Sequence, residues 1–290
     1  MRFSHALLGA EPRDYAAIAQ AAEAAGFDSV ALSDHVFYPE ELSSSYPYTS
    51  DGKPQYQPEE SWPDPWVMVG AMAGVTTDLR FMTNVYVLPL RNPFVVAKAV
   101  GTAAHLSGDR VILGIGAGWM REEFDQLGQP FGGRGARMEE MVEALRMLWR
   151  GGMVEHHGPH FDFDRLEMAP APERPVPIYI GGTSEIALRR AARIGDGWIG
   201  MYHSVEELGE ITRFIAHERE QVGRAELPFD VVASPPLVPK LETVHALEES
   251  GVTTILTSSW MARGQKQVSQ DEAVEMIAAY GDRFIAPLGA

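Results

Sequence analysis

The sequence predicts a (β/α)8 barrel, a closed ring of eight parallel strands that are each followed by a helix. Short apolar runs alternate with amphipathic stretches to the end of the chain, and eight strand–helix pairs can be counted. The 290 residues suit a barrel of roughly 250 residues plus insertions. A doubly wound sheet fits less well, because Gly9-Ala10-Glu11-Pro12 places an acidic residue where that fold holds a phosphate. We expect one barrel domain over residues 1–290.

The strands expected in the first half are short runs rich in Val, Ile, Phe and Tyr. They lie at Arg2–Leu8, Asp28–Ser33, Arg80–Leu88 and Arg110–Gly116. Apolar residues at helical spacing predict a helix after each strand. These helices lie from Tyr15 to the closing Gly26, at Asp64–Thr76, at Asn92–Leu106 and at Arg134–Trp149.

The alternation is tighter in the second half. Strands are expected at Pro177–Ile180, Gly197–Met201, Phe229–Ala233 and Val252–Thr257. Helices are expected at Ser184–Ile194, after Ser204, at about Leu241–Glu249 and near Asp271–Tyr280. The pairs Ser204/Glu207 and Ser269/Glu272 have the spacing of a capping box, which marks the start of a helix.

Two insertions interrupt the repeat, one after strand two and one after strand four. Tyr38–Pro63 is dense in Pro, Ser, Tyr and Gly, and we expect it to cover the mouth of the barrel and to set specificity. His156–Pro175 resembles an excursion with short β segments. Its histidines, His156, His157 and His160, lie away from the strand ends, so we expect no metal site there.

Composition excludes several classes of protein. The net charge of −16 and the absence of a Lys/Arg run argue against binding to nucleic acid or to anionic lipid. No apolar stretch approaches the roughly 20 residues of a membrane helix, and the N-terminus does not resemble a signal peptide. With no cysteine, disulfides, thiolate metal sites and cysteine nucleophiles are excluded. We expect a cytoplasmic protein.

Catalytic and binding groups of a barrel lie at the C-terminal ends of its strands. Strand two ends at Asp34-His35, which is either a proton-transfer pair or a loop cap. Strand four ends at Gly114-Ile115-Gly116-Ala117-Gly118-Trp119, either a close-approach surface for a flat ring or a tight turn. Strand five ends at Gly181-Gly182-Thr183-Ser184, a phosphate cradle or a plain helix N-cap. The acidic Glu122, Glu123 and Asp125 are expected to be a solvated helix start.

At these residues the chain resembles the luciferase-like monooxygenase superfamily, a group of flavin- and deazaflavin-dependent barrels. The resemblance runs from Arg2 to about Tyr202 and more loosely beyond. It is carried by the segments at residues 25–30, 33–35, 88–93, 106–110, 113–124, 180–182 and 191–198. The insertion segment Tyr46-Pro47-Tyr48-Thr49-Ser50-Asp51-Gly52 resembles the subgroup dependent on the deazaflavin coenzyme F420.

The resemblance implies a role for each matching residue. Asp34 and His35 would border the cofactor ring, with His35 as the proton donor or acceptor. A cis peptide bond often found behind the ring would fall at Asn84–Val85. The turn beside the ring would consist of Gly116, Ala117 and Gly118, and the phosphate site of Gly181, Gly182 and Thr183. Arg91, Arg121 and Arg134 are candidates for holding a polyanionic cofactor tail, with surface ion pairing as the alternative.

The chain departs from the glucose-6-phosphate dehydrogenases of this family at two positions. Trp119 stands where they carry a carboxylate, and Pro39 stands where they carry a tryptophan. Both differences argue against a sugar phosphate, and the aromatic mouth favours an apolar or aromatic substrate.

The resulting hypothesis is an F420-dependent oxidoreductase that acts on a small molecule, with a homodimer implied by the family. An FMN-dependent monooxygenase is the first alternative. A non-catalytic ligand-binding barrel and a metal-dependent hydrolase are the others, and the hydrolase ranks last because only Asp34 and His35 could be ligands at strand ends.

Overall fold

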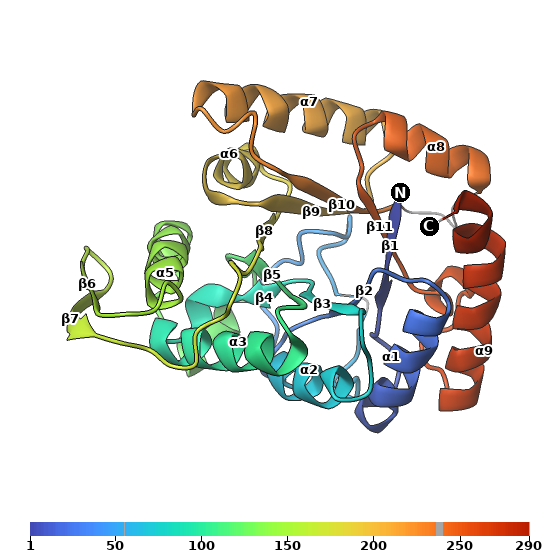
Figure 1. Cartoon of the computed structure of the whole chain (residues 1–290), viewed down its shortest axis with the longest axis horizontal. Helices are drawn as coiled ribbons and strands as arrows, with labels where there is room; N and C mark the ends of the chain where they lie inside the picture. Colours follow the sequence, from blue (N-terminus) through green and yellow to red (C-terminus); the bar gives the residue numbers. More distant parts are fainter. Residues whose placement is uncertain (55, 236–239, 290) are drawn as a thin grey trace.

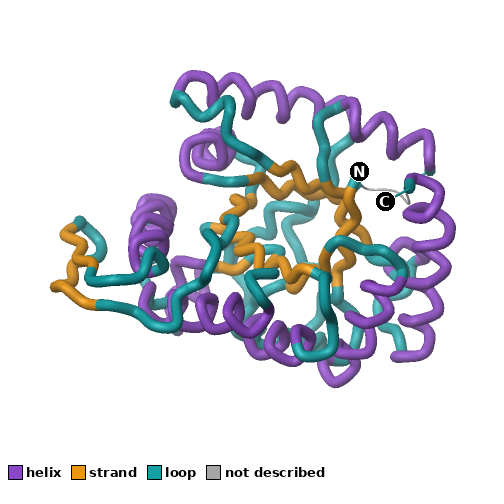
Figure 2. The backbone as a smooth tube through the Cα atoms, in the orientation of Figure 1, coloured by secondary structure: helices purple, strands orange, loops and turns teal. Residues whose placement is uncertain are grey.

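The computed structural model describes residues 1–54, 56–235 and 240–289, and it confirms the barrel. One nine-stranded sheet runs in the order β3-β2-β1-β11-β10-β9-β8-β5-β4, and it closes because β3 also pairs with β5. Every neighbouring pair in this sheet is parallel. In Figures 1 and 2 the strands form a central ring and the helices surround it.

The barrel strands lie close to their expected positions. They are β1 Arg2–Ala6, β2 Ser29–Leu32, β3 Arg80–Thr83, β4 Tyr86–Val87, β5 Val111–Gly116, β8 Ile178–Gly181, β9 Gly197–Met201, β10 Asp230–Ser234 and β11 Thr254–Thr257. The helices are α1 Tyr15–Ala24, α2 Pro65–Ala73, α3 Pro93–Ser107, α4 Arg121–Gln126, α5 Arg134–Leu148, α6 Glu185–Ile194, α7 Val205–Gln221, α8 Leu241–Glu249 and α9 Gln270–Tyr280. Both expected capping boxes are present, at Ser204/Glu207 and at Ser269/Glu272.

The third barrel strand is broken, which differs from the continuous strand expected over Arg80–Leu88. The peptide bond Asn84–Val85 is cis, as the family resemblance implied, and it separates β3 from β4. The ladder to β5 resumes after the break, where Tyr86 pairs with Ile115 and Val87 with Gly116. The backbone between the two pieces therefore lies at the C-terminal mouth of the barrel.

The first strand also ends earlier than expected, at Ala6 instead of Leu8. The chain then turns at Gly9, whose φ of +91° favours glycine. Leu7 nevertheless donates its backbone N–H to the carbonyl oxygen of Ala31 over 3.0 Å and remains buried.

The core has two layers, as the two faces of barrel strands require. A small cluster fills the barrel interior and consists of Ala31, Met82, Ile112, Tyr179, Ile199, Val232 and Leu256. A larger cluster lies between the ring and the helices. At the N-terminal end of the strands, Arg2 pairs with Asp230, which also accepts a hydrogen bond from the Tyr179 hydroxyl. Polar groups thus close the N-terminal end of the barrel, and a functional site is expected at its C-terminal mouth.

The second insertion contains an antiparallel hairpin, β6 Val154–His157 and β7 Asp162–Leu166. In Figure 1 it projects beyond α5, away from the ring. Among the helices of the described residues, none has both the length and the apolar character that crossing a membrane requires.

Candidate functional site

The side chain of Val85 packs against two of the glycine turns that were identified in the sequence. A Cβ atom added at Gly116 would lie 2.7 Å from Val85 Cγ2, and one added at Gly181 would lie 2.8 Å from Val85 Cγ1. Val85 is half-buried and packs on the cluster inside the barrel. The cis segment and the ends of β5 and β8 therefore meet at one place, the top of the barrel interior.

Two further glycines keep this surface free of side chains. Gly118 has a φ of +83°, and a Cβ there would lie 2.6 Å from Val87 Cγ1. Gly182 has a φ of +120°, and its carbonyl oxygen accepts a hydrogen bond of 2.8 Å from Trp198 Nε1. Bare backbone at adjacent strand ends is what the close approach of a flat ring or a phosphate requires.

The helix after β8 begins with a side-chain cap. Ser184 is the N-cap of α6, and its hydroxyl accepts a hydrogen bond from the backbone N–H of Ala187 over 3.3 Å. Ser184 therefore caps the helix, and the exposed Thr183 stands just before it. The turn Gly181–Gly182–Thr183 lies at the positive end of the dipole of this ten-residue helix.

Asp34 is held in a buried ion pair. Its side chain is 3% exposed. The carboxylate accepts hydrogen bonds from both terminal nitrogens of Arg91, at 2.6 and 2.7 Å, and from the backbone N–H of Val87 at 2.8 Å. Burial raises the pKa of the Asp34 carboxyl, and the charge of Arg91 counteracts that rise. Arg91 is thereby engaged in an ion pair, which is the alternative to holding a cofactor tail that the sequence left open.

His35 is bonded through both ring nitrogens. Its Nδ1 lies 3.2 Å from Glu123 Oε2, and its Nε2 lies 3.0 Å from the Tyr56 hydroxyl. Glu123 is 1% exposed and also accepts the backbone N–H of Val36 at 2.7 Å. The expectation of a solvated Glu123 was wrong, because the short helix α4 follows β5 directly and turns this carboxylate inward against the end of β2.

Six aromatic side chains form a connected cluster that is referred to as the aromatic cover: Tyr38, Tyr46, Tyr48, Tyr56 and Trp62 from the first insertion, and Trp119 from the segment after β5. Three of them, Tyr56, Trp62 and Trp119, contact His35. The ring centroid of Trp62 lies 5.0 Å from that of His35, and that of Trp119 lies 5.9 Å away. Trp62 thus reaches His35 from the far end of the insertion. Sequence reasoning missed it because Trp62 lies 27 residues after His35 (62 − 35).

Glu122 anchors the insertion to α4. One of its carboxylate oxygens accepts the backbone N–H groups of Ser43 and Ser44, at 2.7 and 3.0 Å, and both serine hydroxyls donate to the carboxylate. Although partial burial acts in the opposite direction, these hydrogen bonds lower the pKa of Glu122 to about 2. Glu122 was also expected to be solvated, and it is instead the residue that holds residues 43 and 44 in place.

Replacing Glu122 with Gln is expected to destabilise the protein by about 1 kcal/mol at neutral pH, a figure reduced for solvent screening. A carboxyl whose pKa is lowered by folding stabilises the fold fully above its unfolded-state value of 4.5, and this contribution is lost as the pH falls toward about 2. The difference in melting temperature between wild type and E122Q should therefore shrink between about pH 5 and pH 3. A difference that stays constant over this range would contradict the assignment.

Two arginines lie beside the Gly118 turn without a carboxylate partner among the described residues. The guanidinium carbons of Arg121 and Arg134 lie 4.4 and 3.8 Å from the ring centroid of Phe131. Arg134 Nε donates to the carbonyl oxygen of Gly118 over 2.9 Å. Desolvation lowers the pKa of Arg134, and the positive charges of Arg121 and Arg190 lower it further. A pair of like charges of this kind is suited to an anion.

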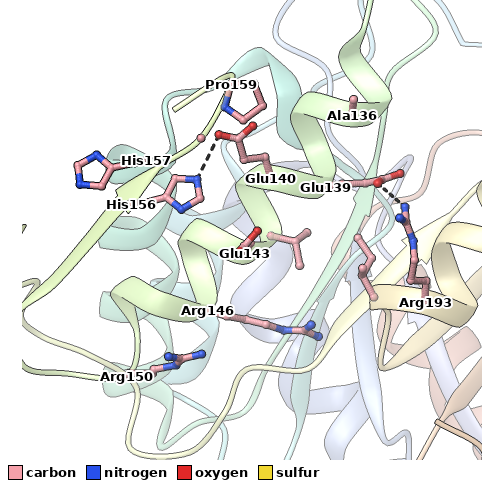
Figure 3. A pocket seen from close by; sticks show the side chains of 13 residues that line it. Ala136, Glu139, Glu140, Glu143, Arg146, Arg150, His156, His157, Pro159 and Arg193 are labelled. Carbon is pink, nitrogen blue, oxygen red and sulfur yellow. Dashed lines mark hydrogen bonds and ion pairs between the residues drawn. The ribbon is translucent and has the colours of Figure 1, made fainter. Parts of the chain in front are cut away.

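A separate open groove of about 700 Å³ lies between α5, α6 and the β6–β7 hairpin. In Figure 3 His156 points toward Glu140 and Arg193 toward Glu139, and both contacts are ion pairs or hydrogen bonds. Glu140 also accepts the backbone N–H groups of His160 and Phe161. These charged groups therefore fasten the hairpin to α5, and no group of three or more His, Asp or Glu side chains suited to a metal ion occurs in the described part of the chain.

The fold and the gathered strand ends define a barrel enzyme of the kind that works at its C-terminal mouth. The chain belongs to the luciferase-like monooxygenase family, whose model matches residues 1–283, and it is therefore an oxidoreductase.

Three similar proteins illustrate the relationship. An uncharacterised protein of Mycobacterium tuberculosis (strain ATCC 25618 / H37Rv) is 38% identical over 256 residues, which cover 88% of each chain. The F420-dependent glucose-6-phosphate dehydrogenase of Tsukamurella paurometabola is 34% identical over 194 residues, which cover 65% of this chain and 53% of that one. The structure of the coenzyme F420-dependent tetrahydromethanopterin reductase from Methanopyrus kandleri matches with a TM-score of 0.77, 16% identity and 99% coverage of each chain. At that identity, the likeness concerns the fold.

Proposed function

We propose that this protein is an F420-dependent oxidoreductase that transfers hydride between the deazaflavin and a small apolar or aromatic substrate. The observation that carries the proposal is the meeting of Val85, Gly116 and Gly181 at the mouth, with His35 at the end of the neighbouring strand β2. The names of two similar proteins, the glucose-6-phosphate dehydrogenase and the methanopterin reductase, support F420 as the cofactor.

The residues at the mouth fit such a ring. Val85 offers it an apolar surface, and Gly116, Ala117 and Gly118 leave one edge open for close contact. Gly181, Gly182 and Thr183 would hold the phosphate at the start of α6 through backbone N–H groups. Asn84 and Asp34 would border the ring, and the ion pair with Arg91 makes Asp34 a positioning residue in this arrangement.

When bound, the deazaflavin supplies the hydride chemistry. The protein holds the substrate beside the ring, and the aromatic cover excludes water from the mouth. His35 takes up or releases the accompanying proton, because imidazole is the side chain whose charge changes near neutral pH. The aromatic cover favours a flat apolar substrate over a sugar phosphate. In this proposal a single barrel domain works as a homodimer in the cytoplasm.

A titration of the purified protein with F420 and with FMN tests the cofactor. We expect F420 to bind with a Kd of about 1 μM or lower, which corresponds to roughly −8 kcal/mol, and FMN to bind more weakly. The second candidate is an FMN-dependent monooxygenase, which the family's own description favours. Micromolar binding of FMN without binding of F420 would select that candidate.

Replacing Arg121 with Gln should weaken F420 binding by about 3- to 10-fold, because the exposed guanidinium would lose its contact with the anionic tail of the cofactor. Binding of the deazaflavin fragment without phosphate and tail should not change. Arg150→Gln, at an exposed residue two positions after the end of α5, is the matched control and should bind F420 normally. Equal affinity of R121Q and wild type for F420 would show that the tail lies elsewhere.

A further inference from the structure

The surroundings of His35 restrict the path of its proton. The side chain is 10% exposed, and each ring nitrogen already faces a protein group, Glu123 at Nδ1 and Tyr56 at Nε2. The rings of Trp62 and Trp119 pack against the imidazole in T-shaped contacts. A proton that enters or leaves His35 must therefore pass through one of the two hydrogen bonds.

The Glu123 side is closed. This carboxylate is 1% exposed, and its partners among the described residues are His35 and the backbone N–H of Val36. A buried carboxylate that accepts a hydrogen bond from Nδ1 fixes the proton of the neutral imidazole on that nitrogen and stabilises the imidazolium. Glu123 is therefore a positioning residue, and Nε2 is the nitrogen that exchanges a proton.

The Tyr56 side is less enclosed, because Tyr56 is 8% exposed and Glu123 is 1% exposed. Tyr56 belongs to the first insertion, and its hydroxyl forms a hydrogen bond of 3.0 Å with Nε2 of His35. Its ring packs against Trp62 with a centroid separation of 4.9 Å and against Tyr38 and Tyr46 at 6.0 and 6.2 Å. Withdrawing Tyr56 from His35 would break these contacts, so passage of the proton through the hydroxyl is the simpler route.

We propose that Tyr56 relays the proton between His35 and the substrate, so that the insertion supplies part of the proton-transfer machinery. The inference rests on the proposed function. In substrate reduction, the hydroxyl gives its proton to the substrate atom made basic by hydride from the deazaflavin, and it takes the Nε2 proton of the imidazolium. His35 is left neutral with its remaining proton on Nδ1, facing Glu123. In substrate oxidation each transfer runs in reverse.

The environment of Tyr56 favours a concerted relay over a stable phenolate. Burial raises the pKa of the Tyr56 hydroxyl, and the neighbouring charge of Glu123 acts in the same direction. The hydroxyl therefore receives one proton as it gives up another.

The exchange of the His35 Nε2 proton with water tests the relay in the protein alone. It is measured by nitrogen-15 NMR on histidine-labelled protein at a pH at which both ring nitrogens carry protons. Tyr56→Phe keeps the ring and its packing but removes the hydroxyl, so exchange should slow by about tenfold or more. Tyr38→Phe is the matched control, because its ring contacts Tyr56 but its hydroxyl makes no hydrogen bond within the described chain, and its exchange should match wild type.

If the Tyr56 hydroxyl has a purely structural role, the exchange rate of the His35 Nε2 proton should rise in Y56F, since loosened packing would admit water. Unchanged or faster exchange in Y56F would overturn the relay. Glu123→Gln adds a second readout: the nitrogen-15 shifts of the neutral ring should show a proton shared between Nδ1 and Nε2, where wild type shows it on Nδ1. A neutral ring that remains fully protonated on Nδ1 in E123Q would overturn the positioning role. Because no cofactor is present, these results are independent of the F420 titration.

Discussion

Replacing His35 with Ala is expected to lower the turnover of the enzyme by about 10²- to 10⁴-fold, the usual contribution of a general acid or base. The imidazole is the titratable group at the mouth whose Nε2 is hydrogen-bonded to Tyr56 of the aromatic cover. The cofactor site is built mainly of backbone and Val85, so F420 affinity should stay within about twofold. The measurement combines steady-state turnover of an aromatic or apolar substrate found by screening with a titration of F420.

The matched control is His105→Ala, an exposed histidine on α3. This variant should retain wild-type turnover and cofactor affinity. Full turnover by H35A would remove His35 from the reaction, whereas a common loss of turnover and F420 binding would indicate a damaged cofactor site.

Replacing Asp34 with Ala should produce a large loss of stability, about 3–5 kcal/mol. The substitution would leave the Arg91 guanidinium buried without its counter-charge, and the backbone N–H of Val87 would lose its acceptor. Denaturant unfolding measures the effect through the midpoint at constant slope.

The double variant Asp34→Ala/Arg91→Met distinguishes the effect of an unpaired buried charge from the effect of lost packing. Removing the unpaired cation should recover most of the stability, because an apolar replacement of a buried ion pair is often close to neutral. A loss below about 1 kcal/mol in D34A alone would mean that solvent reaches Arg91 and that the pair is not truly buried.

The sequence predicted the architecture well because each strand and helix of the barrel is specified by local sequence signals. Strand periodicity, the capping boxes at Ser204 and Ser269, and the turn glycines act within a few residues, and the helix over 241–249 and the strand over 197–201 were predicted to the residue. The cis bond at Asn84–Val85 was expected only through the family resemblance, since neither residue type signals a cis bond.

The site was predictable where it is made of strand ends and was missed where it depends on the insertion. Strand order alone brings Val85, Gly116 and Gly181 together, because the C-terminal ends of adjacent parallel strands meet at one mouth. Tyr56 and Trp62 lie in a segment without regular structure, so no periodicity shows which of its aromatic side chains reaches His35. Glu123 was misread because Glu122 and Asp125 beside it look alike in sequence, and only the direction of α4 distinguishes them.

The central claim is that one planar redox ring lies at the mouth among the ends of β2, β4, β5 and β8. A crystal structure of the protein with F420 tests it most directly. The account predicts the ring against Val85 and the Gly116–Gly118 turn, with the phosphate at Gly182 and Thr183 and the Tyr56–His35 pair beside the ring. Density for the cofactor in the groove between α5 and the β6–β7 hairpin, with the mouth filled by the aromatic cover, would contradict the account.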